Sequence, residues 1–168
     1  KILRRELLRS NKDKAELLMI VDLERNDLGR VCDYGSVRAD SLREIEEYST
    51  VFQTTAQVSA RLHQDKDRFD LLSAAFPGGY ITGCPKIRAM EVIDELEPHR
   101  RNIYTGCFGY LSFCGGLDFN ILIRTILKKG NAVSFGAGGG IVADSDPRQE
   151  YDETLVKAKA MISAITYP

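Results

Sequence analysis

The sequence predicts an α+β fold in which an antiparallel sheet packs with helices. Apolar residues recur at three- and four-residue intervals in several stretches, a pattern typical of amphipathic helices. Other stretches are rich in Thr, Val, Tyr and Phe and are separated by glycine-containing turns, which is typical of antiparallel strands. The 168 residues contain no internal repeat, and 43% of them are hydrophobic. We therefore expect one domain over residues 1–168 with a core of its own.

The first half of the chain combines predicted helices with one predicted strand. Apolar spacing and β-branched content define these elements, which are helices over residues 2–9, 11–27 and 67–75 and a strand over residues 49–62. Within the second helix, Ala15, Leu18 and Leu23 keep helical spacing, although the apolar run 19–21 also fits a strand. The chain starts inside a helical pattern without an initiator Met, so we expect it to be a fragment of a longer protein with a segment preceding it.

A loop rich in glycine and proline separates the two halves of the chain at residues 76–86. Its three glycines and two prolines prevent regular structure and leave backbone N–H groups available. The elements expected after the loop are a helix over 86–96 that ends before Pro98, a three-stranded antiparallel meander over 103–113, 119–127 and 132–135, and a helix over 147–165. Asp144, Ser145 and Asp146 are cap candidates for this last helix.

Charge and composition exclude several classes of function. The 23 Lys and Arg residues balance 24 Asp and Glu residues, so the net charge of −1 favours neither a nucleic-acid partner nor a membrane-surface partner. No apolar run is long enough to cross a bilayer, and we expect a cytoplasmic protein. The four cysteines lack the CxxC spacing of a zinc site.

Two pairs of acidic residues and one lysine form the first candidate site. Asp13 and Glu16, like Glu150 and Glu153, are three residues apart on a predicted helix, so each pair faces one side. Together the four carboxylates suit magnesium, which prefers oxygen ligands. Lys157, one turn after Glu153, suits an ion pair or a substrate carboxylate. Each feature taken alone also fits a solvated helix surface.

Backbone N–H groups and one arginine form a candidate anion site. The loops at 76–86 and 136–140 offer N–H donors, but neither carries a nucleotide-binding signature. Arg124 follows Ile123 in an apolar run where partial burial is expected, and a buried guanidinium requires an anionic partner. That partner is either a ligand or a structural carboxylate.

Several ordered stretches together resemble the chorismate-binding enzymes, a family that includes the anthranilate, aminodeoxychorismate, isochorismate and salicylate synthases. These stretches are residues 12–30, 76–90, 103–106, 123–125 and 138–153, and the resemblance covers nearly the whole chain. It implies half of the β-sandwich-type fold of the anthranilate and aminodeoxychorismate synthases. It also implies that a catalytic lysine segment lies upstream of this chain, which alone would be inactive and, with its apolar face uncovered, would self-associate.

The resemblance also assigns roles to the candidate residues. Glu16 and Glu153 would be the Mg²⁺ ligands, with Asp13 and Glu150 as neighbouring acids. The groups that would bind the carboxylates of chorismate are those of Thr82, Gly83, Tyr104, Arg124, Gly138, Gly140 and Lys157.

The implied reaction displaces the C4 hydroxyl of chorismate by ammonia from a glutamine amidotransferase subunit, with magnesium as Lewis acid. Gln53 stands where many family members carry a histidine associated with pyruvate loss in anthranilate formation. A glutamine amide is neither acid nor base at neutral pH. The resemblance therefore favours the aminodeoxychorismate synthase group, which serves p-aminobenzoate and folate synthesis. Anthranilate synthase component I and a non-catalytic docking module are the alternatives.

Overall fold

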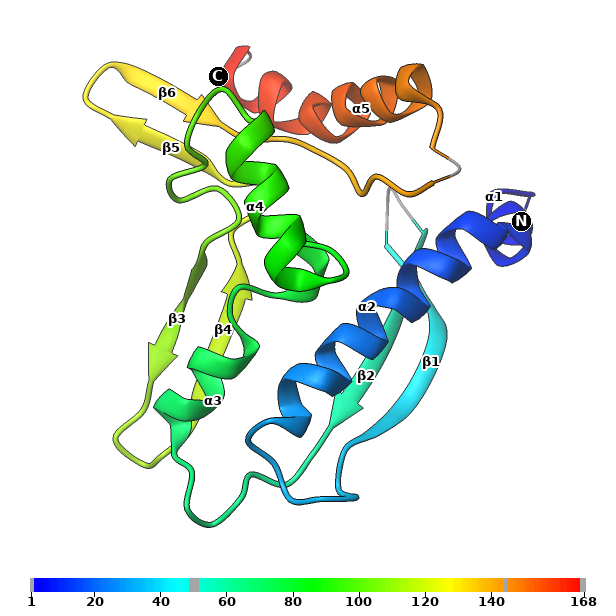
Figure 1. Cartoon of the computed structure of the whole chain (residues 1–168). Coiled ribbons are helices and arrows are strands. Elements are labelled where there is room, and N and C mark those ends of the chain that lie inside the picture. Colours follow the sequence, from blue (N-terminus) through cyan, green and yellow to red (C-terminus); the bar gives the residue numbers. More distant parts are fainter. Residues whose placement is uncertain (1, 49–51, 144, 167–168) are drawn as a thin grey trace. The chain divides into compact units, whose positions relative to one another are not determined.

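The computed structural model describes residues 2–48, 52–143 and 145–166 and consists of helices and antiparallel strands (Figure 1). The predicted α+β class is confirmed, since every paired strand in the described ranges is antiparallel. The chain divides into two compact units, residues 1–89 and 90–168. The single domain expected over residues 1–168 stays a prediction.

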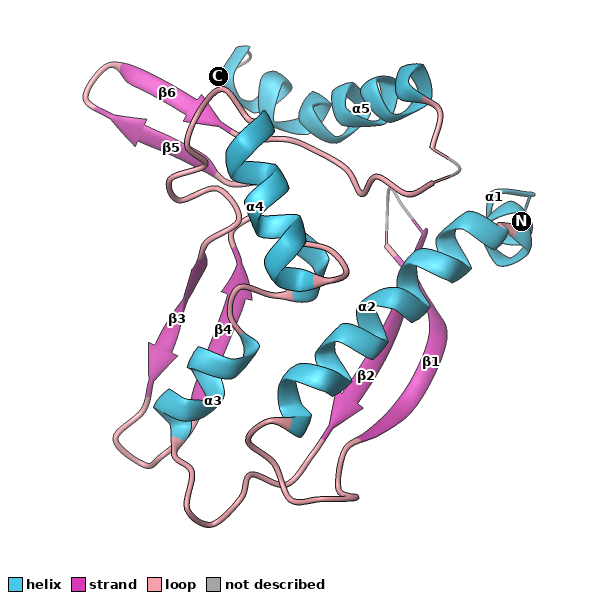
Figure 2. Ribbon diagram, in the orientation of Figure 1, coloured by secondary structure: helices cyan, strands magenta, loops and turns pink. Residues whose placement is uncertain are grey.

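The first unit is built on a long helix and a two-stranded sheet. Its elements are α1 (Ile2–Arg9), α2 (Asn11–Gly29), β1 (Arg38–Glu47), β2 (Phe52–Ser59), α3 (Arg68–Ala75) and the short 3-10 helix η1 (Gly79–Ile81). α2 packs along the antiparallel β1–β2 pair (Figure 2). Its buried residues Val21 and Leu23 form a core with Val31 and Ala74.

The strand β1 was missed by the sequence prediction. Its side chains alternate between exposed and partly buried, but the inward positions include a serine and an arginine, so no apolar alternation marks it. The strand predicted over residues 49–62 is found as β2, and residues 49–51 lie outside the described part.

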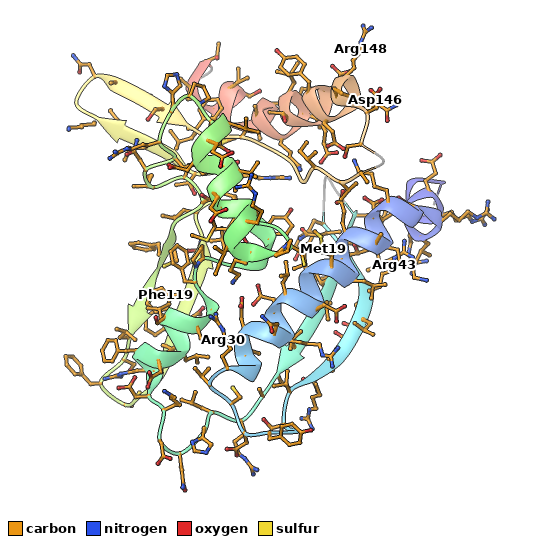
Figure 3. The ribbon with its side chains drawn as sticks, viewed as in Figure 1. Met19, Arg30, Arg43, Phe119, Asp146 and Arg148 are labelled. Carbon is orange, nitrogen blue, oxygen red and sulfur yellow. The ribbon has the colours of Figure 1, made fainter. Side chains whose placement is uncertain are left out.

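Arg43 joins β1 to the junction between the first two helices (Figure 3). It lies at an irregularity in the strand, with a φ of 68°, and its Nη2 donates to the carbonyls of Leu7 at 2.7 Å and Ser10 at 3.1 Å. The Ser10 hydroxyl in turn accepts the N–H of Asp13 at 3.2 Å and caps α2. The hydrogen bonds of Arg43 on β1 therefore fix the position of the turn where α2 starts.

The second unit contains two hairpins and a long helix. Its elements are the end of α4 (Lys86–Leu96), β3 (Cys107–Leu111), β4 (Leu117–Ile121), β5 (Ile126–Lys129), β6 (Ala132–Phe135) and α5 (Pro147–Thr166). Asp146 caps α5 by accepting the N–H groups of Arg148 and Gln149 (Figure 3), whereas Asp144 lies outside the described residues.

The predicted three-stranded meander is wrong. β3 pairs only with β4, and β5 pairs only with β6, within the ranges that the structure describes. The chain bends between the two hairpins, where Arg124 takes a φ of 50° that interrupts an extended strand. Of the helices in the described ranges, none combines the length and apolar character of a membrane span.

Replacing Arg43 by methionine is expected to destabilise the protein by about 2 kcal/mol, because two carbonyls lose a charged donor. Urea unfolding monitored by circular dichroism measures this change. Arg38→Met, on the same strand but 76% exposed in an ion pair with Asp40, is the control and should change the midpoint little. Equal midpoints for both variants would contradict the role given to Arg43.

Candidate functional site

The first turns of α5 place three charged side chains on one face. Glu150, Glu153 and Lys157 follow one another at helical spacing. Glu150 is only 6% exposed, and its Oε1 accepts a hydrogen bond from the Ser145 hydroxyl at 2.6 Å. Lys157 Nζ lies 2.6 Å from Glu153 Oε1. The helix therefore presents two carboxylates and one ammonium group close together.

The glycine-rich loop before α5 passes directly over these charges. A Cβ atom placed on Gly139 would lie 3.5 Å from Glu150 Oε2, 3.5 Å from Lys157 Nζ and 3.6 Å from Glu153 Oε1. The backbone at Gly139 therefore lies close to all three side chains. It brings peptide groups beside both signs of charge, an arrangement suited to an anionic ligand and a cation together.

Tyr104 packs against the start of the same loop. A Cβ atom on Gly136 would lie 2.4 Å from Cγ of the Tyr104 ring, and one on Gly138 would lie 3.1 Å from its hydroxyl. The Tyr104 N–H donates to the Arg101 carbonyl at 3.0 Å. Tyr104, Gly138, Glu150, Glu153 and Lys157 thus lie close together in the second unit, and their binding roles stay predictions. Gly140 lies in the same loop and is exposed.

The turn that carries Tyr104 is held by an ion pair between Arg101 and Glu97. Arg101 Nε lies 2.9 Å from Glu97 Oε2, and its Nη2 lies 2.6 Å from Oε1. Hydrogen bonding to Arg101 lowers the pKa of Glu97, and the same bond raises the pKa of Arg101. The geometry is bidentate, which fixes the guanidinium plane as well as its position.

Asp13 and Glu16 lie in the first turns of α2, in the first unit. Both are partly buried, and Glu16 forms a long ion pair with Lys12, with 3.9 Å between Oε1 and Nζ. Among the described residues, no group of three or more His, Cys, Asp or Glu side chains is placed to hold a metal. The chemistry of the two acidic pairs nonetheless fits magnesium, because each pair supplies hard oxygen donors.

Thr82 and Gly83 directly follow η1 in the loop that leads to α4. The Thr82 N–H donates to the Gly79 carbonyl at 3.3 Å, and its hydroxyl donates to the Gly78 carbonyl at 2.9 Å. Gly83 has a φ of 146°, and a Cβ there would lie 3.0 Å from Ala89 Cβ, so only glycine fits without strain. The Thr82 N–H is therefore already used within the loop.

The environment predicted for Arg124 is wrong. The side chain is exposed at the bend between β4 and β5, not partly buried in a strand. The left-handed backbone at this position ends the extended run that the apolar neighbours suggested. A binding role for Arg124 stays a prediction.

Four charged residues of the first unit were given no role from the sequence. Asp27 is 1% exposed and pairs with both Arg30 and Lys86, while Glu24 accepts the N–H of Gly79 at 3.3 Å. Burial raises the pKa of Glu24, and the nearby Asp27 carboxylate adds to this effect. The three-residue spacing of residues 24, 27 and 30, which places them on one helix face, could have indicated this charged cluster from the sequence.

A family model described as chorismate binding enzyme matches residues 1–163. The chain belongs to this family. It is 54% identical over 160 residues to an anthranilate synthase component I-like protein of Synechocystis, covering 95% of the chain and 33% of that protein. It is 53% identical over 157 residues to aminodeoxychorismate synthase component 1 of Klebsiella aerogenes, covering 94% of the chain and 35% of that protein. The chain spans about a third of the length of these relatives.

Solved structures of the family share the fold. Anthranilate synthase component I from Streptococcus pneumoniae matches with a TM-score of 0.87 and 43% identity, covering 95% of this chain and 37% of the other. A Bacillus anthracis protein described as a 2,3-dihydroxybenzoate-specific isochorismate synthase matches with a TM-score of 0.85 and 26% identity, covering 98% and 44%. The expected likeness to these chorismate-binding enzymes is confirmed.

Replacing Gly136 by alanine is expected to destabilise the protein by about 2 kcal/mol, because the new methyl group overlaps the Tyr104 ring. Thermal unfolding measures the loss. Gly139→Ala is the matched control, since its methyl group would meet its neighbours at ordinary contact distances. If the two variants melt together, the packing of Tyr104 on Gly136 is refuted.

The raised pKa of Glu24 predicts a specific dependence of stability on pH. A carboxyl that binds its proton more tightly when folded stabilises the protein fully below its ordinary pKa near 4.5, and this contribution is lost as pH rises through the folded value. Glu24→Gln should therefore gain stability relative to the parent protein across that interval. Urea midpoints of the parent protein and of Glu24→Gln, measured between about pH 4 and pH 8, test this prediction. Glu44→Gln, at an exposed position, is the control. If the midpoints of the parent and of Glu24→Gln change with pH in parallel, the predicted contribution of Glu24 is excluded.

Proposed function

We propose that the protein is the synthase component of an aminodeoxychorismate synthase, which aminates chorismate at C4 with ammonia from a glutamine amidotransferase subunit. The observation that carries the proposal is the placement of Glu150, Glu153 and Lys157 around the Gly139 backbone. Membership of the family supports chorismate as the substrate. The similarity to aminodeoxychorismate synthase component 1 supports amination.

The residues of this chain serve to bind and orient the substrate. Chorismate is a dianion, so Lys157, the Tyr104 hydroxyl and the N–H groups of 138–140 are its proposed partners. Glu16 and Glu153, with Asp13 and Glu150, would hold magnesium. When bound, that ion supplies a Lewis acid that neutralises the ring carboxylate. In the reaction the C4–N bond forms as the C4–O bond breaks, and the hydroxyl leaves as water with a proton from ammonia.

The choice of product rests on Gln53. Its side chain is exposed on β2 and cannot transfer a proton at neutral pH, which supports an enzyme that retains the enolpyruvyl group. Overall identity does not discriminate, because anthranilate synthase component 1 of Mycolicibacterium smegmatis is 49% identical over 98% of the chain. Anthranilate formation is therefore the second candidate, and its fluorescent product would identify it when the full-length protein is supplied with chorismate, ammonia and magnesium. A non-catalytic docking module would give neither product.

Chorismate is expected to bind the purified protein at least about tenfold more tightly with magnesium than without it, because the carboxylates otherwise repel the dianion. Isothermal titration calorimetry measures both affinities. Glu153→Ala should abolish the difference.

The matched control is Asp152→Ala, the neighbouring acid on α5, whose side chain is exposed. It should keep the magnesium dependence. The proposal fails if chorismate binds equally with and without magnesium, or if the control loses as much as Glu153→Ala.

A further inference from the structure

Charged side chains at the end of α2 and the start of α4 bind the loop between α3 and α4. We call these four residues, Glu24, Asp27, Arg30 and Lys86, the loop anchor. At its centre Asp27 is 1% exposed, with Oδ2 against Lys86 Nζ and Oδ1 at 3.2 Å from Arg30 Nη2. A carboxylate buried to this degree is stable only with such partners.

Each of the other three side chains also reaches the backbone of the loop. Arg30 Nη2 donates to the Ala74 carbonyl, and Lys86 Nζ donates to the Pro77 carbonyl at 2.8 Å. Glu24 Oε1 accepts the N–H of Gly79 at 3.3 Å. Three points of the segment 74–79 are thus tied to α2.

The loop lies tightly against α2 where it is tied. A Cβ on Gly79 would come within 2.7 Å of Leu23 Cβ, so the peptide rests directly on the helix. Gly79 and Ile81 are buried. From this base η1 leads into Thr82, whose N–H donates to the Gly79 carbonyl, and then into Gly83.

Stability alone gives little reason for this cluster. Apolar side chains of similar volume often replace a buried ion pair without loss of stability, because desolvation offsets the attraction between the charges. What apolar groups cannot do is hold three backbone groups at set directions, since hydrogen bonds alone have that directionality. The cluster therefore fits a requirement for loop geometry.

We infer that the loop anchor is a set of positioning residues that fixes the backbone at Gly83, whose N–H would bind a carboxylate of the substrate while the Thr82 N–H closes the turn. This inference rests on the proposed function, which supplies chorismate as the ligand. The anchor residues do not touch the ligand in this role. They act through the loop, and their removal weakens binding while leaving the core folded.

The test compares the parent protein with Arg30→Met and with the double variant Asp27→Leu and Lys86→Met. Arg30 is 54% exposed, so its replacement keeps the protein folded even if the double variant fails. Asp22→Asn is the control, because Asp22 lies on the same helix in an exposed pair with Arg25. Three quantities are measured for each protein: the melting temperature, the hydrogen exchange of the amides at 79, 81 and 82, and the affinity for chorismate with magnesium.

The expected result is faster exchange at these amides and about tenfold weaker chorismate binding in the anchor variants, with a near-unchanged melting temperature and an unaffected control. Faster exchange with full affinity would overturn the inference, because the anchor would then serve the loop alone. Unchanged exchange would overturn it as well. If the parent protein bound no chorismate, the proposed function would fail, and the assigned ligand with it, whereas the exchange data would still decide whether the anchor orders the loop.

Discussion

The buried carboxylate of Asp27 is the interaction on which the arrangement of the loop between α3 and α4 depends. An ionised group out of water requires compensation, and here it comes from Lys86 and Arg30. The spare donors of these two cations then reach the carbonyls of Pro77 and Ala74. Satisfying one charge therefore connects the end of α3, the glycine-rich loop and α2 into a single hydrogen-bonded structure.

The second unit also contains a buried carboxylate that requires a partner, that of Glu150. This carboxylate is nearly inaccessible to water and is met by the Ser145 hydroxyl, while Lys157 neutralises Glu153 one turn along. Both acidic pairs lie in the first turns of capped helices, because Ser10 caps α2 and Asp146 caps α5. A carboxylate near the N-terminus of a helix interacts favourably with the helix dipole.

Local patterns predicted the helices well. Apolar spacing located α2, α3, α4 and α5, and one of the three cap candidates, Asp146, caps α5. The i, i+3 spacing of Glu150 and Glu153 correctly placed them on one face. These features depend on residues within a turn of each other, which is the range over which sequence patterns are informative.

Features that depend on distant partners were missed. From the sequence alone Asp27 is expected at the surface, because its partner Lys86 lies 59 positions later in the chain. β1 escaped because its inward face includes Arg43, whose partners are carbonyls of α1 and the following turn. The bend at Arg124 was missed because a left-handed arginine has no signature among apolar neighbours.

The site has space for a methyl group at Gly139. A side chain there would stand over two carboxylates and an ammonium group at ordinary contact distances, whereas Gly136 is closed by an aromatic ring. A methyl group at Gly139 would therefore fit without moving the backbone, whereas one at Gly136 would overlap the Tyr104 ring. Of these two glycines in one loop, only Gly136 is required by sterics.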